Sequence, residues 1–372
     1  MIDSRQTLYQ LLTETPALAD YFAANGLPSD AQDPRARRLT LASALSFKKI
    51  DPQRFCCEAE LFLTQYASRL REQDAADACD LLVRIPCVVQ LPIEEALNRY
   101  IQANAPALRH NTELVEFGGE WLSSLMRSHR PPVVIGGGVE GMANLPGLAE
   151  EYEAPQGALN PDFAGMEDPR GTFRVLSGIP LVMVVDENRL DGREAPQGIA
   201  DLLSGRFEQS AIYPDDGHML DGVLLYYFYL AGGMEAVDAL RSACICGVHP
   251  SQMIKFGGIE ERPAVMLMPY IFARIKAKEP GMRVVWPSEG APLIPILECV
   301  RRDASSEARA AADFLAGEEV GRLFMEQGMF PSSHPVVRNN LPGRLWFAGW
   351  ENIYADCLVE LLPRLKKRFL EG

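Results

Sequence analysis

The stretch Val284–Ile296 reads VVWPSEGAPLIPI and decides the fold expected for this chain. Its prolines and glycine exclude a regular helix, and a proline in a central strand lacks the N–H donor that a sheet ladder needs. The apolar residues on both sides of Ser288 are nonetheless typical of a buried segment. We therefore expect a kinked strand that crosses between two lobes, with its kink at Trp286–Gly290 facing the cleft between them.

A second long apolar stretch, Thr172–Asp186, reads TFRVLSGIPLVMVVD and predicts a strand broken at Ser177–Pro180. Alternating strand and helix patterns lie before this stretch and between the two stretches, which indicates parallel sheets with crossover helices. The expected fold class is α/β, with two lobes joined by two crossing strands. The first lobe would comprise residues 84–177 and 287–372, and the second lobe would comprise residues 178–286.

The elements expected in each lobe follow from hydrophobic periodicity and from the positions of Gly and Pro. Those of the first lobe are strands over 85–92, 112–118 and 131–138, and helices over 93–104 and 119–128. Those of the second lobe are helices over 199–205 and 218–232, a strand over 210–213, and a strand that turns into a helix over 264–277. Residues 142–171 are rich in Pro and Gly and predict a long loop.

Residues 1–70 differ from the rest and predict a small helical accessory domain. Short helical patterns are followed by a longer one that begins after Asp51, and Gly26 is typical of a helix end. This region holds 8 basic and 8 acidic residues, so residues 71–372 carry the whole net charge of −14. That charge argues against binding to nucleic acid or to an anionic membrane surface.

Targeting signals and cysteine spacing bear on where the protein works. The N-terminus has no apolar run resembling a signal peptide, and the most apolar stretch, Val223–Ala231, is shorter than the ~20 residues needed to span a bilayer. The eight cysteines include no C-x-x-C pair, so we expect free and mostly buried thiols. The expected location is cytoplasmic, without insertion into a membrane.

Four segments resemble bacterial solute-binding proteins of the ABC-transporter type, in the periplasmic-binding-protein-like class II fold and its ferric-iron branch. They are VLSGIPLVMVVDENRL (175–190), PQGIADLLSG (196–205), VVWPSEGAPLIPI (284–296) and AADFLAGEEVGRLFMEQGMFPSSHPVV (311–337). The resemblance runs from about Ile85 to Phe369. It implies two lobes, a small ligand in the cleft between them, and an ABC transporter as partner. Proteins of that branch often carry an adjacent Tyr-Tyr pair, where this chain reads Met268-Pro269-Tyr270.

Residues 1–66 resemble the N-terminal helical domain of di-iron proteins for iron–sulfur cluster repair. The matching positions are Leu11, Leu12, Pro16, Leu18, Phe22 and Gly26. That family often carries cysteine after the glycine, and this chain has Leu27 there. The resemblance implies a redox or iron–sulfur protein as a second kind of partner.

Three motifs admit a structural and a functional interpretation. Gly136-x-Gly138-x-x-Gly141 follows a strand but opens no good helix, so a tight turn or a loop that brings backbone N–H groups to a ligand is favoured over a dinucleotide site. Asp215–His218 precedes a predicted helix. This segment can cap the helix, or it can form an anion site in which His218 is a donor. Cys244-x-Cys246 with His249 does not match a standard zinc pattern.

The sequence contains no nucleophile elbow, P-loop or H-E-x-x-H motif, so we expect no catalytic residue, and we expect no cofactor. The first hypothesis is a solute-binding protein or sensor that holds a small anion or metal chelate. An enzyme acting on a small phosphorylated or carboxylated metabolite, and a protein that recruits a redox partner, remain as alternatives. The candidate ligand-binding residues are Gly137, Ser177, His218, Tyr270, Trp286, Ser288 and Glu289.

Overall fold

In a computed structural model the chain forms two compact units, Met1–Ala75 and Ala76–Gly372. The structure describes residues 2, 4–30, 33–48, 50–52, 55–56, 58–60, 62–63, 79–112, 126, 129–137, 145–155, 157–214, 220–255, 263–355 and 358–371. Within these ranges, no helix combines the length and the apolar composition that crossing a membrane requires.

The N-terminal unit contains four described helices around a small apolar core. They are α1 (Leu8–Glu14), α2 (Leu18–Ala24), α3 (Pro34–Arg38) and α4 (Leu41–Lys48). A capping box between Thr7 and Gln10 opens α1, and Gly26 follows α2 with a φ of 63°, which glycine adopts without strain. Leu8, Phe22 and Leu45 are fully buried in the core of this unit. Most of the helix expected after Asp51 lies outside the described residues.

The unit Ala76–Gly372 is built on one mixed sheet. Its described strands follow the order β2-β1-β3-β10-β5-β8-β6-β7, and in addition β4 and β11 pair with β10 and β9 pairs with β5. The bounds are β1 Leu81–Val83, β2 His110–Asn111, β3 Val133–Gly136, β4 Tyr152–Glu153, β5 Arg174–Asp186, β6 Ala211–Pro214, β7 Cys244–Val248, β8 Val265–Pro269, β9 Met282–Val285, β10 Ala291–Arg301 and β11 Leu345–Trp346. We call the part that contains β1, β2 and β3 the first lobe, and the part that contains β6, β7 and β8 the second lobe.

Strand β5 passes from one lobe to the other without a break, although the sequence predicts a break at Ser177–Pro180. Its first half pairs with β10, and from Leu181 onward it pairs with β8 and β9. Pro180 is the last residue paired with β10. The position without an N–H donor therefore lies where the partner strand changes, and for this reason the strand tolerates a proline there.

The stretch Val284–Ile296 forms parts of two strands rather than one kinked strand. Strands β9 and β10 both run antiparallel to β5, and Trp286–Gly290 loops out between them. Gly290 has a φ of 111°, a conformation that disfavours any residue with a Cβ. The predicted interruption is thus present as a five-residue turn in the second crossing.

The strand predicted over 85–92 is wrong, because this segment opens helix α6 (Cys87–Asn104). Val89, Ile93, Leu97 and Ile101 recur every four residues and are all buried, which is a helical spacing. Pro86 is the N-cap residue that precedes the first turn, and Pro92 lies inside the helix. The expected strand over 112–118 and helix over 119–128 lie almost wholly outside the described residues.

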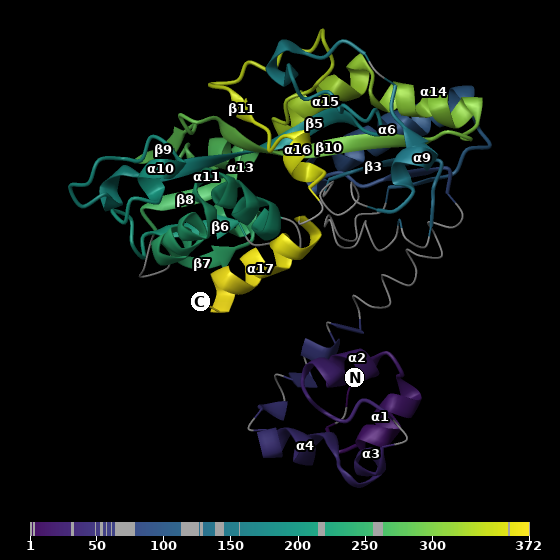
Figure 1. Cartoon of the computed structure of the whole chain (residues 1–372), viewed down its shortest axis with the longest axis vertical. Helices are drawn as coiled ribbons and strands as arrows, with labels where there is room; N and C mark the ends of the chain where they lie inside the picture. Colours follow the sequence, from purple (N-terminus) through teal and green to yellow (C-terminus); the bar gives the residue numbers. More distant parts are fainter. Residues whose placement is uncertain are drawn as a thin grey trace. The chain divides into compact units, whose positions relative to one another are not determined.

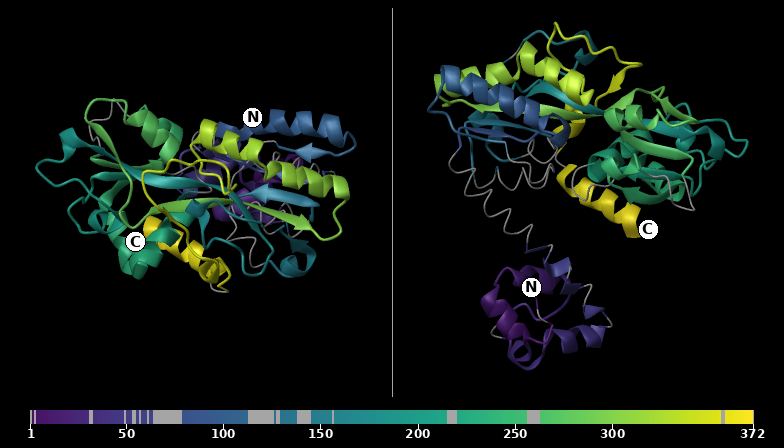
Figure 2. Two further views of the ribbon diagram at one scale, coloured as in Figure 1. Left: turned by 90° about the horizontal axis from the view of Figure 1, so that it is seen from above. Right: turned by 180° about the vertical axis from the view of Figure 1, so that it is seen from behind.

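The remaining helices cover the sheet. They are α9 (Leu148–Glu151), α10 (Ile199–Leu202), α11 (Leu220–Ala243), α12 (Pro250–Met253), α13 (Tyr270–Lys276), α14 (Ser306–Leu315), α15 (Glu318–Gly328), α16 (Trp350–Ile353) and α17 (Leu358–Glu371). Helices α6, α14 and α15 lie together on the first lobe (Figures 1 and 2). Helix α11 bends at Gly232 and Gly233, and the His249 side chain caps α12 by accepting from the backbone N–H of Ser251.

Helix α17 packs on α11 of the second lobe, although residues 287–372 were assigned to the first lobe. Arg368 makes two contacts of 2.7 Å with Asp238, and the ring of Phe369 meets the edge of Tyr213 at 4.9 Å between centroids. The other lobe boundaries stay a prediction.

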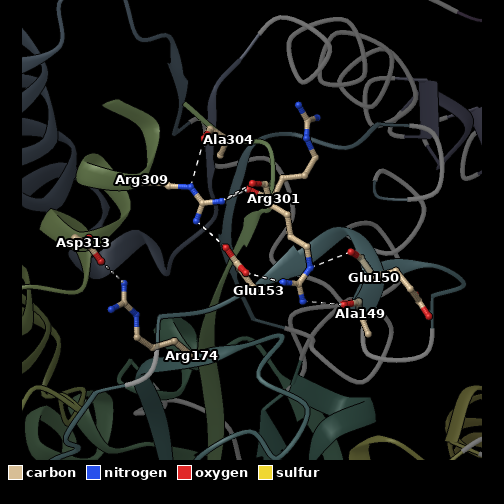
Figure 3. A network of polar contacts seen from close by, with 9 residues as sticks. Ala149, Glu150, Glu153, Arg174, Arg301, Ala304, Arg309 and Asp313 are labelled. Atoms are coloured by element: carbon tan, nitrogen blue, oxygen red, sulfur yellow. Dashed lines mark hydrogen bonds and ion pairs between the residues drawn. The ribbon is translucent and has the colours of Figure 1, made fainter. Parts of the chain in front are cut away.

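An arginine cluster fastens the end of β10 to the loop before β5 (Figure 3). The carboxylate of Glu153 accepts from Arg302 at 2.6 Å and from Arg309 at 2.8 Å. The Arg302 guanidinium also donates to backbone carbonyls of α9, and that of Arg309 donates to carbonyls at the end of β10. The first lobe is therefore tied together at its outer end, away from the middle of the crossing strands.

Candidate functional site

The carboxyl ends of the parallel strands of both lobes point toward the middle of the crossing strands. In the first lobe, β3 starts opposite Val300 and ends with Gly136 opposite Leu297, and Leu297 in turn faces Val175 of β5. In the second lobe, β8 ends with Pro269 opposite Leu181 of β5. Val175 and Leu181 are six residues apart, which is roughly 20 Å along a strand. Ligands of open α/β sheets bind outside such carboxyl ends, so this region is the first candidate site.

Two predicted site residues lie at these strand ends. Gly137 directly follows β3 and is buried. Tyr270 directly follows β8, begins α13 and is 5% exposed. Its hydroxyl has no hydrogen-bond partner within the described part of the chain, while its ring meets Trp286 edge-on at 5.2 Å between centroids. His218 and residues 138–144 lie outside the described residues.

Ser177 is placed on the first crossing strand as predicted, and its hydroxyl has a protein partner. It is fully buried and donates to the carbonyl of Pro331 at 2.9 Å. The neighbouring Ser333 hydroxyl donates to the carbonyl of Leu176 at 3.1 Å. These bonds join β5 to the loop after α15.

Trp286 is half-buried and holds the turn after β9 to a distant loop. Its indole N–H donates to the carbonyl of Arg344 at 2.8 Å. A Cβ added to Gly343 would lie 2.5 Å from the Trp286 ring, so this approach requires glycine.

Ser288 and Glu289 fasten the same turn to α10. The Glu289 carboxylate accepts from the backbone N–H groups of Ile199 at 3.2 Å and Ala200 at 3.1 Å, and the Ser288 hydroxyl donates to it at 3.2 Å. Burial raises the pKa of Glu289, but these donors together outweigh burial, so the pKa is lowered. A Cβ on Gly198 would lie 2.2 Å from this carboxylate. The free N–H groups in the first turn of α10 thus already have an acceptor, which is a carboxylate of the protein itself.

A cleft of about 1340 Å³ lies between the lobes, beside this turn. Its lining includes Met166, Glu167, Arg170, Ile199, Leu203, Ala231, Glu289, Arg344, Trp346, Phe347, Trp350, Glu351 and Tyr354. Glu289 is the one predicted site residue, among those described, that borders it. Sequence reasoning missed its aromatic wall, for which the dense run of aromatic residues over 346–354 was the available signal.

The described residues contain no group of three or more His, Cys, Asp or Glu side chains that could hold a metal ion. Cys244 and Cys246 lie on β7, where the first is buried and the second exposed. Burial raises the pKa of the Cys244 thiol to about 12. Cys79, Cys244 and Cys299 are buried, and none of them forms a disulfide within the described residues.

The family model described as bacterial extracellular solute-binding protein matches residues 146–356. That description gives no support to a cytoplasmic location, and the resemblance of residues 1–66 to the iron–sulfur repair domain is not confirmed. No curated protein matches the chain.

Solved structures share the fold at low identity. The periplasmic binding protein AfuA from Actinobacillus pleuropneumoniae, with fructose-6-phosphate bound, has a TM-score of 0.58 and 14% identity, over 79% of this chain and 99% of its own. IdiA (FutA) of Trichodesmium, in complex with iron and citrate, has a TM-score of 0.58 and 11% identity, over 79% and 100%. Apo ferric ion-binding protein A from Pasteurella haemolytica has a TM-score of 0.58 and 10% identity, over 78% and 99%. The predicted two-lobed class II fold is confirmed, and about a fifth of the chain has no counterpart in these structures.

Proposed function

The chain belongs to the bacterial extracellular solute-binding proteins, and we propose that it holds a small anionic solute where the carboxyl ends of the parallel strands meet. Proteins of this type bind small ligands and deliver them to the permeases of ABC transporters. The bound fructose-6-phosphate of AfuA and the citrate of IdiA suggest a phosphate or carboxylate group as the recognised chemistry.

The observation that carries the proposal is Tyr270 at the end of β8. Its ring is almost fully buried, yet its hydroxyl has no partner among the described residues. A hydroxyl that projects from a rigid helix start can donate to an oxyanion without first losing a protein hydrogen bond. Gly137 lies at the facing strand end, where glycine lets backbone N–H groups approach a ligand.

Free ferric iron is less favoured as cargo than an anion or a metal chelate. Hard Fe(III) is held by several oxygen ligands, and this chain has Pro269 beside Tyr270 where the ferric-iron branch often carries two adjacent tyrosines. A chelate such as ferric citrate would bring its own ligands to the metal. No observation in the described residues favours the enzyme or the redox-partner alternative over solute binding.

The test is thermal unfolding with inorganic phosphate, fructose-6-phosphate, citrate and ferric citrate. A ligand present at a hundredfold over its Kd stabilises the native state by about 2.7 kcal/mol, so we expect at least one of these to raise the melting temperature. Tyr270→Phe should reduce that rise. Tyr229→Phe is the matched control, because Tyr229 stacks on Tyr226 within α11, away from the strand ends. No rise with any of the four anions, or a full rise in Tyr270→Phe, would contradict the proposal.

A further inference from the structure

The cleft beside α10 has one aromatic wall and one aliphatic wall. Trp346 and Phe347 are half-buried and line it from the segment after α15. Ile199, Leu203 and Ala231 line it from the second lobe. Neither Gly137 nor Tyr270 borders it, so the solute site proposed above leaves this cleft without a role.

A rigid scaffold holds the aromatic wall in place. The Asp168 carboxylate is 5% exposed and accepts from the backbone N–H groups of Arg170, Thr172 and Phe173, each at 2.9 Å, and from the Tyr354 hydroxyl at 2.7 Å. The indole N–H of Trp350 donates to the carbonyl of Met166 at 3.0 Å. The loop before β5 and helix α16 are therefore locked together before any ligand arrives, which lowers the entropic cost of binding.

Two guanidinium groups border the cleft with unused donors. The Arg170 guanidinium lies 3.8 Å from the centroid of the Tyr354 ring and has no hydrogen bond or ion pair within the described ranges. Arg344 donates through Nε to the carbonyl of Glu289 at 2.9 Å, and its two terminal nitrogens have no described partner. Both side chains are exposed at the rim. A planar carboxylate is the natural acceptor for such a fork of donors.

The acidic side chains at the same rim restrict the charge of a ligand. Glu289 is engaged by α10, but Glu167 and Glu351 are exposed and border the cleft. They would repel a ligand that carries several negative charges. A single carboxylate on an aromatic ring fits both the donors and the walls.

We propose that this cleft is a second binding site, which takes a small aromatic monocarboxylate. The ring lies against Trp346 and Phe347, and the carboxylate accepts from Arg170 and Arg344. Pockets for small ligands usually measure about 300–1,000 Å³, and the 1340 Å³ of this cleft exceed that range, so its volume leaves room for a ligand of two fused rings. The inference is independent of the solute proposed for the strand ends.

Isothermal titration calorimetry with three matched probes tests the inference. Indole-3-acetate carries ring and carboxylate, acetate carries the carboxylate alone, and indole-3-ethanol carries the ring alone. We expect indole-3-acetate to bind at least tenfold more tightly than either of the others. Equal affinity for all three, or no binding of indole-3-acetate, would overturn the proposal.

Variants then locate the bound probe. Arg170→Gln and Arg344→Gln should each raise the Kd of indole-3-acetate at least tenfold, while Arg364→Gln, an exposed control on α17, should leave it unchanged. An unchanged Kd in both cleft variants would overturn the proposal. Tyr270→Phe should not affect this probe. If Tyr270→Phe abolishes its binding, the probe sits at the strand ends, and the cleft proposal falls while the proposed solute site stands.

Discussion

The strand ends and the aromatic cleft are both openings between the lobes, but different parts of the chain specify them. The register of β3, β10, β5 and β8 sets the strand ends, which therefore depend on backbone pairing rather than on particular side chains. The cleft is built by side chains on loops, chiefly by the bonds of Asp168 with the residues around Tyr354. The topology of the sheet thus determines where this fold can bind a solute, while the side chains on the loops determine what the second opening can recognise.

The largest expected effect is a pH dependence of stability, at the outer end of the crossing strands β5 and β10 that both openings share. Glu298 of β10 faces Arg174 of β5 and is fully buried. Burial raises the pKa of Glu298 to about 7, and Arg174 offsets burial only in part. The native state thus keeps this proton up to about pH 7, whereas the unfolded chain releases it near pH 4.5. Stability from this group is full below pH 4.5 and falls by about 3 kcal/mol as the pH rises to 7.

Urea unfolding of the wild type and Glu298→Gln at pH 4.5 and 7.5 checks this effect. The free energy of unfolding of the wild type, relative to that of the variant, should decrease from pH 4.5 to pH 7.5. Glu326→Gln, at an exposed position of α15, is the control that should show no such change. A difference between wild type and Glu298→Gln that does not depend on pH would contradict the assignment.

The middle of the crossing pair should be sensitive to added volume. A Cβ on Gly178 would lie 2.5 Å from the Leu293 side chain and 3.0 Å from the carbonyl of Ile294. Gly178→Ala should therefore lower the free energy of unfolding by about 1–3 kcal/mol. Gly157→Ala is the control, because nothing lies within 4 Å of its added methyl. Equal stability of the two variants in urea titrations would show that the crossing is not tightly packed.

The turn between β9 and β10 should have a smaller effect, through α10. Glu289→Ala removes the acceptor of two backbone N–H groups, which should cost about 1 kcal/mol, as for loss of a helix cap. Glu167→Ala removes a carboxylate at the rim of the same cleft that has no described partner, so its stability should match the wild type. Comparing the thermal unfolding of the two variants separates the loss of the hydrogen bonds to α10 from the effect of removing a negative charge. Identical losses would mean that Glu289 acts only through its charge.

The sequence predicted the crossing strands and most of the second lobe because these depend on local apolar runs and on prolines. The strand followed by a helix over 264–277 is present as β8 and α13, and the strand over 210–213 is present as β6. The predicted strand over 85–92 is wrong because the segment was divided from the helix predicted over 93–104, whereas the helical spacing of buried residues runs from Val89 to Ile101.

The aromatic cleft could not be predicted, because its contacts are not local. Asp168 and Tyr354 are 186 residues apart in the chain, and no short pattern marks that pairing. Likewise Glu289 was expected to face a ligand, and its engagement with α10, 89 residues away, is visible only in the structure. Tyr270 was predicted from the resemblance to the Tyr-Tyr pair of the ferric-iron branch, and its place directly after a strand is as expected.

Hydrogen–deuterium exchange is the most direct test of whether the solute binds at the strand ends. Exchange is compared with and without whichever of phosphate, fructose-6-phosphate, citrate or ferric citrate stabilises the chain most. We predict slower exchange in peptides that cover residues 84–86, 136–137 and 269–270, with little change over 164–170 and 344–354. Slower exchange confined to 164–170 and 344–354, or none with any of the four anions, would contradict the account.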